Sequence, residues 1–381
     1  MNTGLFDYFA PAVDAPPLRC SAKKLAAAAV TVLAALIILE ARGLPEPSPL
    51  ERLERQAAVT MEQASAVVRA AREASGYPIH DVLDPNRTGL IGLEYSDITT
   101  TEGSLIAKRT STNPAFAAVV ARMLSDGGVK RGDRVAVNMS GSFPALNIAV
   151  LSACKALELE PRIISSVGAS NYGANVPGLT WLDMERLLND AGLFPYRAVA
   201  VSLGGVVETG GGIDGTGIEL GLEAVRRHGA PLLEEGDYRT VVAAMDNRQR
   251  IFDAAGPVAA FISVGGSLTS LGWVPEAARL EAGLLRRVPA SADPARGLIF
   301  RYVERGIPAV HLLNVARLAE RNALPVDPIP LPRAEDVNPD RFRQRFRLTA
   351  MVAAAWCAAG LVLMVCETRR RKREIEEIEG V

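Results

Sequence analysis

The stretch from Arg134 to Asn175, RVAVNMSGSFPALNIAVLSACKALELEPRIISSVGASNYGAN, decides the fold. It begins with a short apolar run, turns at serine and glycine, continues as an apolar segment of helical length and ends in a second β-branched run. Two apolar runs of strand length separated by a helix predict a parallel βαβ unit, because parallel strands are buried on both faces. The stretch therefore predicts an α/β domain.

The same alternation continues along the chain. Strands are predicted at residues 134–139, 162–167, 198–203, 258–264 and 309–312, with helices near 144–158, 181–191, 216–228, 238–255 and 314–323. Continuous apolar strands that alternate with helices are typical of a doubly wound fold with a mainly parallel sheet. We assign residues 76–325 to this α/β domain.

Two apolar runs flank the domain. The second, residues 348–366, has about the 20-residue length that a transmembrane helix needs, and a basic cluster follows it. The first, 25–41, is short for a span, but it lacks the small-residue cleavage pattern of a signal peptide, so we predict an uncleaved anchor. Basic residues in the tails 1–24 and 367–381 favour a cytoplasmic location for both termini and an extracytoplasmic domain at the inner (plasma) membrane.

Four arginines just before the second span, between residues 341 and 347, oppose this orientation. The proline-rich and basic stretch 326–346, which overlaps the PVDPIPLP segment at 325–332, is predicted to be a stiff linker to that span.

Two further elements are predicted near the start of the domain. Ser48 and Glu51 form a capping-box pattern that begins a stalk helix over 48–75, which either packs on the domain or associates into a homo-oligomer. The segment from Gly89 to Lys108 is rich in threonine and β-branched residues, which predicts strand and hairpin.

Composition excludes several classes of function. The 381 residues are 49% hydrophobic, enough for a sizeable core, and a net charge of -1 gives no electrostatic reason to expect nucleic acid as a partner. The three histidines are not at metal-ligand spacing, so we expect no metal and no cofactor. Cys154 lies in an apolar helical segment and is predicted to be a buried side chain rather than a nucleophile.

Three predicted strands end alike, in VNMSGS (137–142), VSLGGV (201–206) and ISVGGS (262–267). Ligands of open α/β sheets bind outside the carboxyl ends of the strands, where glycines allow close approach and backbone amides accept an anion. The plainer interpretation is that small residues only permit tight turns. We predict a site for a carboxylate or phosphate, lined by Ser140, Gly141, Ser142, Ser166, Ser170, Asn171, Gly204, Gly205, Glu208, Asp214, Gly265, Gly266 and Ser267.

Two alternatives remain for this crevice. Ser140 lies at a strand-to-helix turn, as a hydrolase nucleophile would, and His311 or Glu208 could act as its base, although the first glycine of G-x-S-x-G is missing. Gly210 to Gly215 match the G-x-G-x-x-G pattern of a nucleotide- or dinucleotide-binding Rossmann-like domain, but four residues separate them from the preceding strand.

Distinctive segments of the chain are GLEYSDITTTEG, NMSGSFPALN and SSVGASNYGANVPG. Together with the paired anchors, they resemble the poly-γ-glutamate system protein family, bacterial membrane proteins associated with the machinery that makes and exports poly-γ-glutamate. The resemblance covers about Tyr77 to Trp273 and both anchors. It implies an accessory role in the cell envelope or capsule, with the anionic polymer and the synthase and export membrane proteins as partners. It implies no catalytic residues; any hydrolase or transpeptidase activity would act on γ-glutamyl bonds.

Overall fold

The computed structural model describes residues 47–336 apart from 207 and 234–240, together with a few positions nearer the ends of the chain. One compact unit is Pro47–Asp340, and the other consists of Met1–Glu46 with Arg341–Val381. The two predicted spans and both tails lie almost entirely outside the described residues and stay predictions. No helix within the described residues is both long and apolar enough to cross a membrane.

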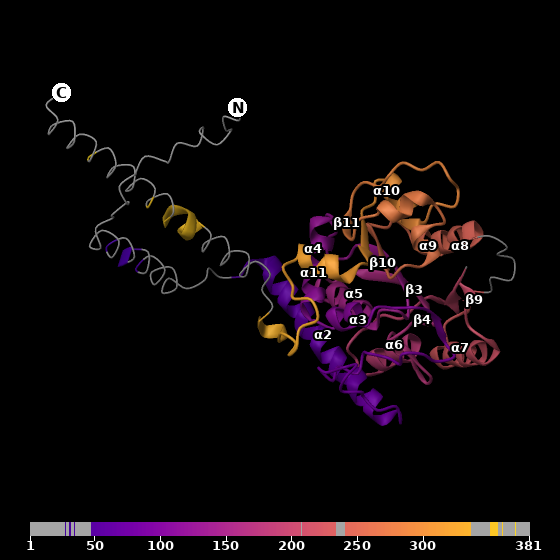
Figure 1. Cartoon of the computed structure of the whole chain (residues 1–381). Coiled ribbons are helices and arrows are strands. Elements are labelled where there is room, and N and C mark those ends of the chain that lie inside the picture. Colours follow the sequence, from indigo (N-terminus) through magenta and orange to yellow (C-terminus); the bar gives the residue numbers. More distant parts are fainter. Residues whose placement is uncertain are drawn as a thin grey trace, which may run out of the picture. The chain divides into compact units, whose positions relative to one another are not determined.

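A six-stranded sheet forms the centre of the larger unit, in the order β11-β12-β10-β2-β3-β7 (Figure 1). Its strands are β2 (Arg134–Met139), β3 (Glu160–Ser166), β7 (Ala200–Ser202), β10 (Ala260–Val264), β11 (Gly283–Leu285) and β12 (Ala309–Leu312). All neighbouring pairs are parallel except β11 and β12, which are antiparallel. The predicted α/β class and the mainly parallel sheet are confirmed.

The strand order reverses at β2. The chain runs outward from β2 through β3 to β7, then returns to the other side of β2 to form β10 and β12. Val137 of β2 pairs with Ile163 of β3 and with Ile262 of β10, so the carboxyl ends of these strands lie at one edge of the sheet. Connections that leave β2 and β10 in opposite directions open a crevice at that edge.

Helices pack on both faces of the sheet. Val135 and Val137 belong to a large apolar cluster with residues of α2 (Pro49–Ala74), α4 (Ala115–Asp126), α5 (Pro144–Ala156) and α6 (Trp181–Asp190). Ala136 points to the opposite face, since successive strand residues alternate, and lies in a second cluster with α8 (Val241–Asp253) and α10 (Leu298–Glu304). Cys154 of α5 is fully buried as predicted, and burial raises the pKa of its thiol to about 12.

The remaining elements complete the domain. They are β1 (Thr99–Thr101), α3 (Leu105–Ser111), β4 (Ala169–Ser170), β5 (Asn175–Val176), β6 (Leu179–Thr180), β8 (Gly204–Gly205), β9 (Thr209–Gly211), α7 (Gly215–His228), α9 (Leu268–Leu271), α11 (Val315–Arg321) and the 3-10 helices η1 (Pro275–Arg279) and η2 (Ala334–Asp336).

The predicted hairpin over Gly89 to Lys108 is wrong. The segment contributes only β1, which pairs in parallel with β4, and its last residues begin helix α3. The hydroxyl of Ser104 accepts a hydrogen bond from the amide of Ala107, and this N-cap favours a helix over a returning strand. Lys108 therefore lies on a helix that borders the crevice.

The first part of the predicted linker 326–346 packs on the domain instead of leaving it. Asp327 forms an ion pair with Arg109, and its backbone amide donates to the hydroxyl of Thr110. The side chain of Asn86 donates to the carbonyl of Pro328. The helix predicted as a stalk, α2, begins at the expected capping box, and its apolar side is part of the domain core.

Candidate functional site

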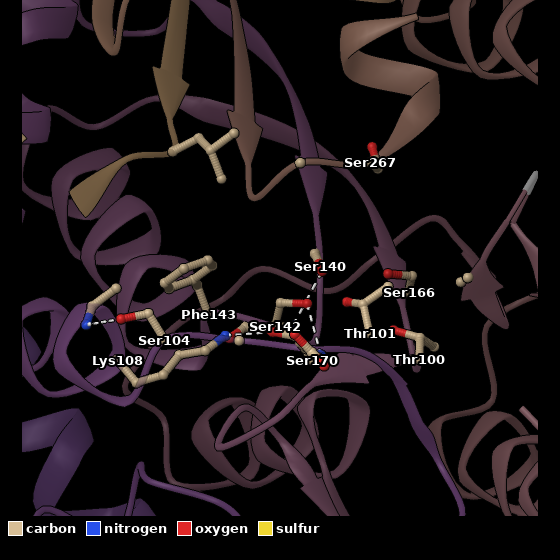
Figure 2. Close-up of a pocket in the computed structure, with 18 of the residues that line it drawn as sticks. Thr100, Thr101, Ser104, Lys108, Ser140, Ser142, Phe143, Ser166, Ser170 and Ser267 are labelled. Atoms are coloured by element: carbon tan, nitrogen blue, oxygen red, sulfur yellow. Dashed lines mark hydrogen bonds between the residues drawn. The ribbon is translucent and has the colours of Figure 1, made fainter. Parts of the chain in front are cut away.

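A pocket of about 660 Å³ lies at the carboxyl ends of β2, β3, β10 and β12 (Figure 2). It sits where the strand order reverses, the position at which open α/β sheets bind ligands. The structure brings together there most of the predicted ligand-binding residues, namely Ser140, Ser142, Ser166, Ser170, Gly204, Gly205, Glu208, Gly266 and Ser267.

Four predicted residues do not line the pocket. A side chain on Gly141 would meet the carbonyl of Val167, so this glycine packs against the next strand end instead. Asp214 caps α7 by accepting a hydrogen bond from the amide of Gly217 at 2.8 Å. The other two are Asn171, whose amide donates to the carbonyl of Thr101, and Gly265, which lies against the side chain of Ser140.

Two glycines allow the loops that carry Ser142 and Ser170 to pack closely. A Cβ on Gly173 would lie 2.9 Å from the carbonyl oxygens of both Ser142 and Ser170, and one on Gly141 would lie 2.6 Å from that of Val167. Because neither glycine has a side chain, the turn after β2 and the loop after β3 approach to hydrogen-bonding distance. The amide of Ser170 then donates to the hydroxyl of Ser142 at 3.0 Å.

The hydroxyls of Ser140 and Ser142 are oriented by backbone amides. Ser140 Oγ accepts from the amide of Ser142 at 3.1 Å, and Ser142 Oγ accepts from the amide of Ser170. Neither hydroxyl donates to an acceptor within the described residues. Each can therefore donate its hydrogen to a ligand in the pocket.

Lys108 lines the pocket and was not among the predicted site residues. Its side chain is 2% exposed, and its Nζ donates to the carbonyl of Ser142, lies 2.7 Å from Ser170 Oγ and sits 3.8 Å from the centre of the Phe143 ring (Figure 2). Burial lowers the pKa of this amine to about 7. No carboxylate pairs with Lys108 among the described residues, which is uncommon for a buried cation.

Lys108 was missed because residues 89–108 were predicted to form a hairpin, whereas residues 105–111 form helix α3. Ser104 and Lys108 are four residues apart, so on a helix they share one face, and both line the pocket. On a strand, residues four apart also lie on one face, but about 13 Å from each other, so they would not be expected at one small site. The pocket lining that was not predicted also includes Thr100, Thr101, Glu102, Ser104, Phe143 and Asn314.

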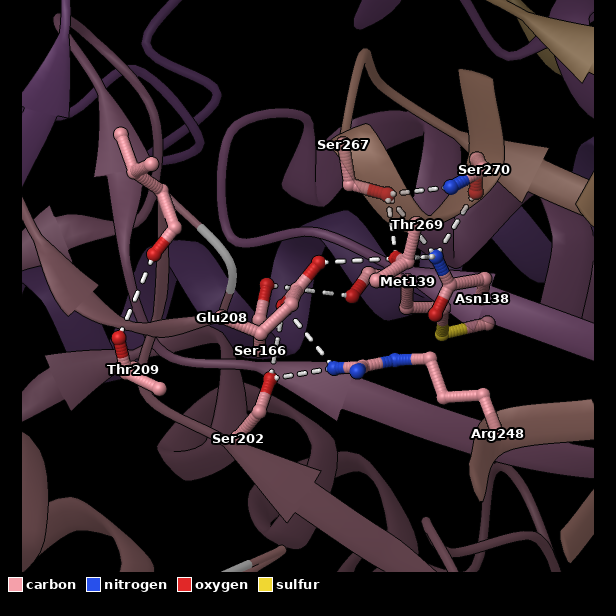
Figure 3. Close-up of polar contacts among 11 residues, drawn as sticks. Asn138, Met139, Ser166, Ser202, Glu208, Thr209, Arg248, Ser267, Thr269 and Ser270 are labelled. Atoms are coloured by element: carbon pink, nitrogen blue, oxygen red, sulfur yellow. Dashed lines mark hydrogen bonds and ion pairs between the residues drawn. The ribbon is translucent and has the colours of Figure 1, made fainter. Parts of the chain in front are cut away.

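Glu208 belongs to a buried network at the floor of the crevice (Figure 3). Its carboxylate lies 3.0 Å from the guanidinium of Arg248 and accepts hydrogen bonds from the hydroxyls of Ser202 at 2.9 Å and Thr269 at 3.0 Å. These contacts occupy both carboxylate oxygens of Glu208. We therefore assign Glu208 to the support of the β8–β9 turn and not to proton transfer.

His311 lines a different pocket, of about 520 Å³. It is 3% exposed, and burial lowers the pKa of its imidazole to about 4, so the ring is neutral near pH 7. Ser140 lies in the larger pocket, and no hydrogen bond joins the two side chains. The geometry gives no support to a Ser140–His311 pair.

The glycine-rich match at Gly210 to Gly215 falls on β9 and the start of α7. The dinucleotide fingerprint requires these glycines at the turn after the first strand, which here is the β2–α5 turn. Within the residues that the structure describes, no group of three histidine, cysteine, aspartate or glutamate side chains could hold a metal ion.

The fold and the pocket define a class, an α/β domain with a polar, lysine-containing site at the switch point of a mainly parallel sheet. No family model, curated protein or solved structure matches this chain. The function has to be inferred from the chemistry of the pocket.

Proposed function

We propose that the pocket binds a carboxylate of an anionic ligand, and that Lys108 is the residue that recognises it. The observation that carries this proposal is a buried ammonium group whose contacts are a carbonyl, a hydroxyl and an aromatic ring. An uncompensated buried charge is costly, and an anion that enters the pocket supplies the missing partner.

Neighbouring groups add to this recognition. Ser140 and Ser142 each have a hydroxyl hydrogen to donate, as described above. Helix α5 has 13 residues and begins at Pro144, directly after the pocket residue Phe143. The positive end of a helix of this length favours negative charge, so it acts in the same direction as Lys108.

The sequence resemblance supports a γ-glutamyl polymer as the ligand, because that polymer carries one carboxylate per unit. On this proposal the chain is a membrane-anchored accessory component of poly-γ-glutamate synthesis or export. Its two spans hold the domain on the outer side of the plasma membrane, where it meets the polymer or the synthase and export proteins. A volume of about 660 Å³ is in the ordinary range for a small-molecule site.

Calorimetric titration of the full-length chain with a short γ-linked glutamate oligomer tests this function. We expect Lys108→Met to weaken binding by about 10- to 100-fold, the usual effect of losing a charge-assisted hydrogen bond. The matched control is Lys130→Met, since Lys130 is exposed and does not line the pocket. Equal binding of an uncharged γ-linked isoglutamine oligomer, in which each α-carboxylate is replaced by an amide, or an unchanged affinity in Lys108→Met, would contradict the proposal.

A further inference from the structure

Lys108 and Ser170 have the geometry of a base and a nucleophile. Lys108 Nζ lies 2.7 Å from Ser170 Oγ and also donates to the carbonyl oxygen of Ser142. A neutral amine has two N–H donors and one lone pair. With one donor on the Ser142 carbonyl, the lone pair is available to accept the hydroxyl hydrogen of Ser170, which is the arrangement that activates a serine.

The surroundings set the protonation state of this amine. The Phe143 ring, 3.8 Å from Nζ, favours the charged form, and burial favours the neutral form. Burial dominates, since the pKa is lowered to about 7. The other charged side chains that line the pocket are Glu102, which is exposed, and Glu208, which is paired with Arg248. A neutral Lys108 is therefore well populated near neutral pH.

The hydroxyl of Ser170 is open to the pocket because residue 103 is glycine. A Cβ on Gly103 would lie 2.9 Å from Ser170 Oγ and 3.2 Å from Ser170 Cβ, so any side chain there would cover the hydroxyl. Both Gly103 and Ser170 line the pocket. By contrast, the serine singled out from the sequence, Ser140, has no amine or imidazole within hydrogen-bonding distance among the described residues.

We propose that Ser170 is the nucleophile, and Lys108 its general base, in acyl transfer from an amide or ester bound in the pocket. This activity goes beyond ligand binding, although it uses the same pocket. It requires the neutral form of Lys108, whereas carboxylate binding requires the protonated form. The two proposals therefore predict pH profiles of opposite sign.

The reaction balances with groups that are present and water. Ser170 Oγ attacks the carbonyl carbon, and its proton moves to Lys108 Nζ as the C–O bond forms. The resulting ammonium returns that proton to the leaving nitrogen or oxygen when the C–N or C–O bond of the substrate breaks. Water, or an amine acceptor, then attacks the acyl group with Lys108 again as base, and Ser170 regains its hydrogen. The hydroxyls of Ser140 and Ser142, which line the same pocket, each have a hydrogen to donate to the developing oxyanion.

Labelling of the full-length chain with a fluorophosphonate tests the assignment. Ser170 Oγ would displace fluoride and form a stable phosphonate ester, which peptide mass spectrometry locates. We expect the labelling rate to rise about tenfold per pH unit up to about pH 7 and then level off, following the unprotonated fraction of Lys108. Lys108→Met should slow labelling by about 100-fold or more, and Ser170→Ala should remove the adduct.

Two controls separate chemistry from folding. Lys130→Met and Ser125→Ala alter an exposed lysine and a half-buried serine of α4, neither of which lines the pocket, and both should label at the wild-type rate. Thermal unfolding of each variant confirms that it is folded. An adduct at another residue, no adduct, or wild-type labelling of folded Lys108→Met would overturn the assignment. Intact Ser170 labelling without oligomer binding would instead reject the binding function alone.

Discussion

Replacing Lys108 by methionine tests the physical basis of both proposals, because it exchanges a buried amine for an apolar side chain of similar length. Lys108 is 2% exposed, and its pKa is lowered from the ordinary value of 10.5 to about 7. That difference corresponds to about 5 kcal/mol of folding free energy that the protonated lysine costs. Methionine removes this cost but also loses the contacts with Ser142 and Ser170, which contribute about 1 kcal/mol each.

The sign of the effect follows from proton binding. Between about pH 7 and 10.5 the unfolded chain keeps a proton on Lys108 that the folded domain has released. The stability of the wild type therefore rises with pH through this window, by up to about 1.4 kcal/mol per pH unit from this residue. Below pH 7 both states are protonated and the full cost is present. Lys108→Met should be the more stable protein by about 3 kcal/mol at low pH, and the advantage should shrink above pH 7.

Urea-induced unfolding of the full-length wild type and Lys108→Met, followed by circular dichroism at several pH values between about 6 and 9, measures this difference. Subtracting the two curves removes the titration of every other group. Lys130→Met serves as the control, since an exposed lysine should change stability little and with no pH dependence over this range. Parallel wild-type and Lys108→Met curves would show that burial does not lower the pKa of Lys108, and would remove the basis of the proposed serine activation.

Three further outcomes are expected. Affinity for the γ-glutamate oligomer should fall by up to about tenfold per pH unit above pH 7, because an anion binds the protonated form of Lys108; calorimetry over that range measures it. Gly205→Ala should destabilise the domain in thermal unfolding, since a Cβ there would lie 2.2 Å from the carbonyl of Gly211 and the backbone has φ 74°, whereas Gly266→Ala, with no neighbour closer than 3.5 Å, should unfold like the wild type. Glu208→Ala should cost about 3 kcal/mol in urea unfolding, because it removes a carboxylate paired with the buried guanidinium of Arg248.

The parallel sheet could be predicted because its signal is local. The run 134–139 is mainly apolar and a segment of helical length begins five residues after it, so the predicted strand 134–139 and helix 144–158 agree with β2 and α5. The position of the crevice also follows from sequence, since the carboxyl ends of parallel strands share one edge. The order of the strands could not be predicted, because the return of the chain from β7 to β10 depends on contacts between distant segments.

The chemistry of the site was less predictable. The serines and glycines at the strand ends could be found because they interrupt apolar runs. Lys108 could not, since it lies on the seven-residue helix α3, which is too short for a clear periodic pattern and follows threonines that favour strand. Glu208 was predicted to line the site and it does, but its pairing with Arg248 of α8 could not be predicted, because the two residues are 40 positions apart in the sequence.

The two proposed roles of Lys108 are linked through a single proton. A carboxylate beside Nζ raises the pKa of the amine and holds it protonated, and a protonated amine cannot accept the hydrogen of Ser170. An uncharged amide or ester does not raise the pKa of Lys108. The pocket would therefore distinguish an acyl substrate from the acid that its hydrolysis releases. The acid should therefore slow Ser170 labelling most strongly just above pH 7, where the free amine is largely neutral and the bound one is not. If a γ-glutamate oligomer binds without slowing the labelling of Ser170, the carboxylate and the acyl group occupy separate parts of the pocket, and Lys108 serves only one of them.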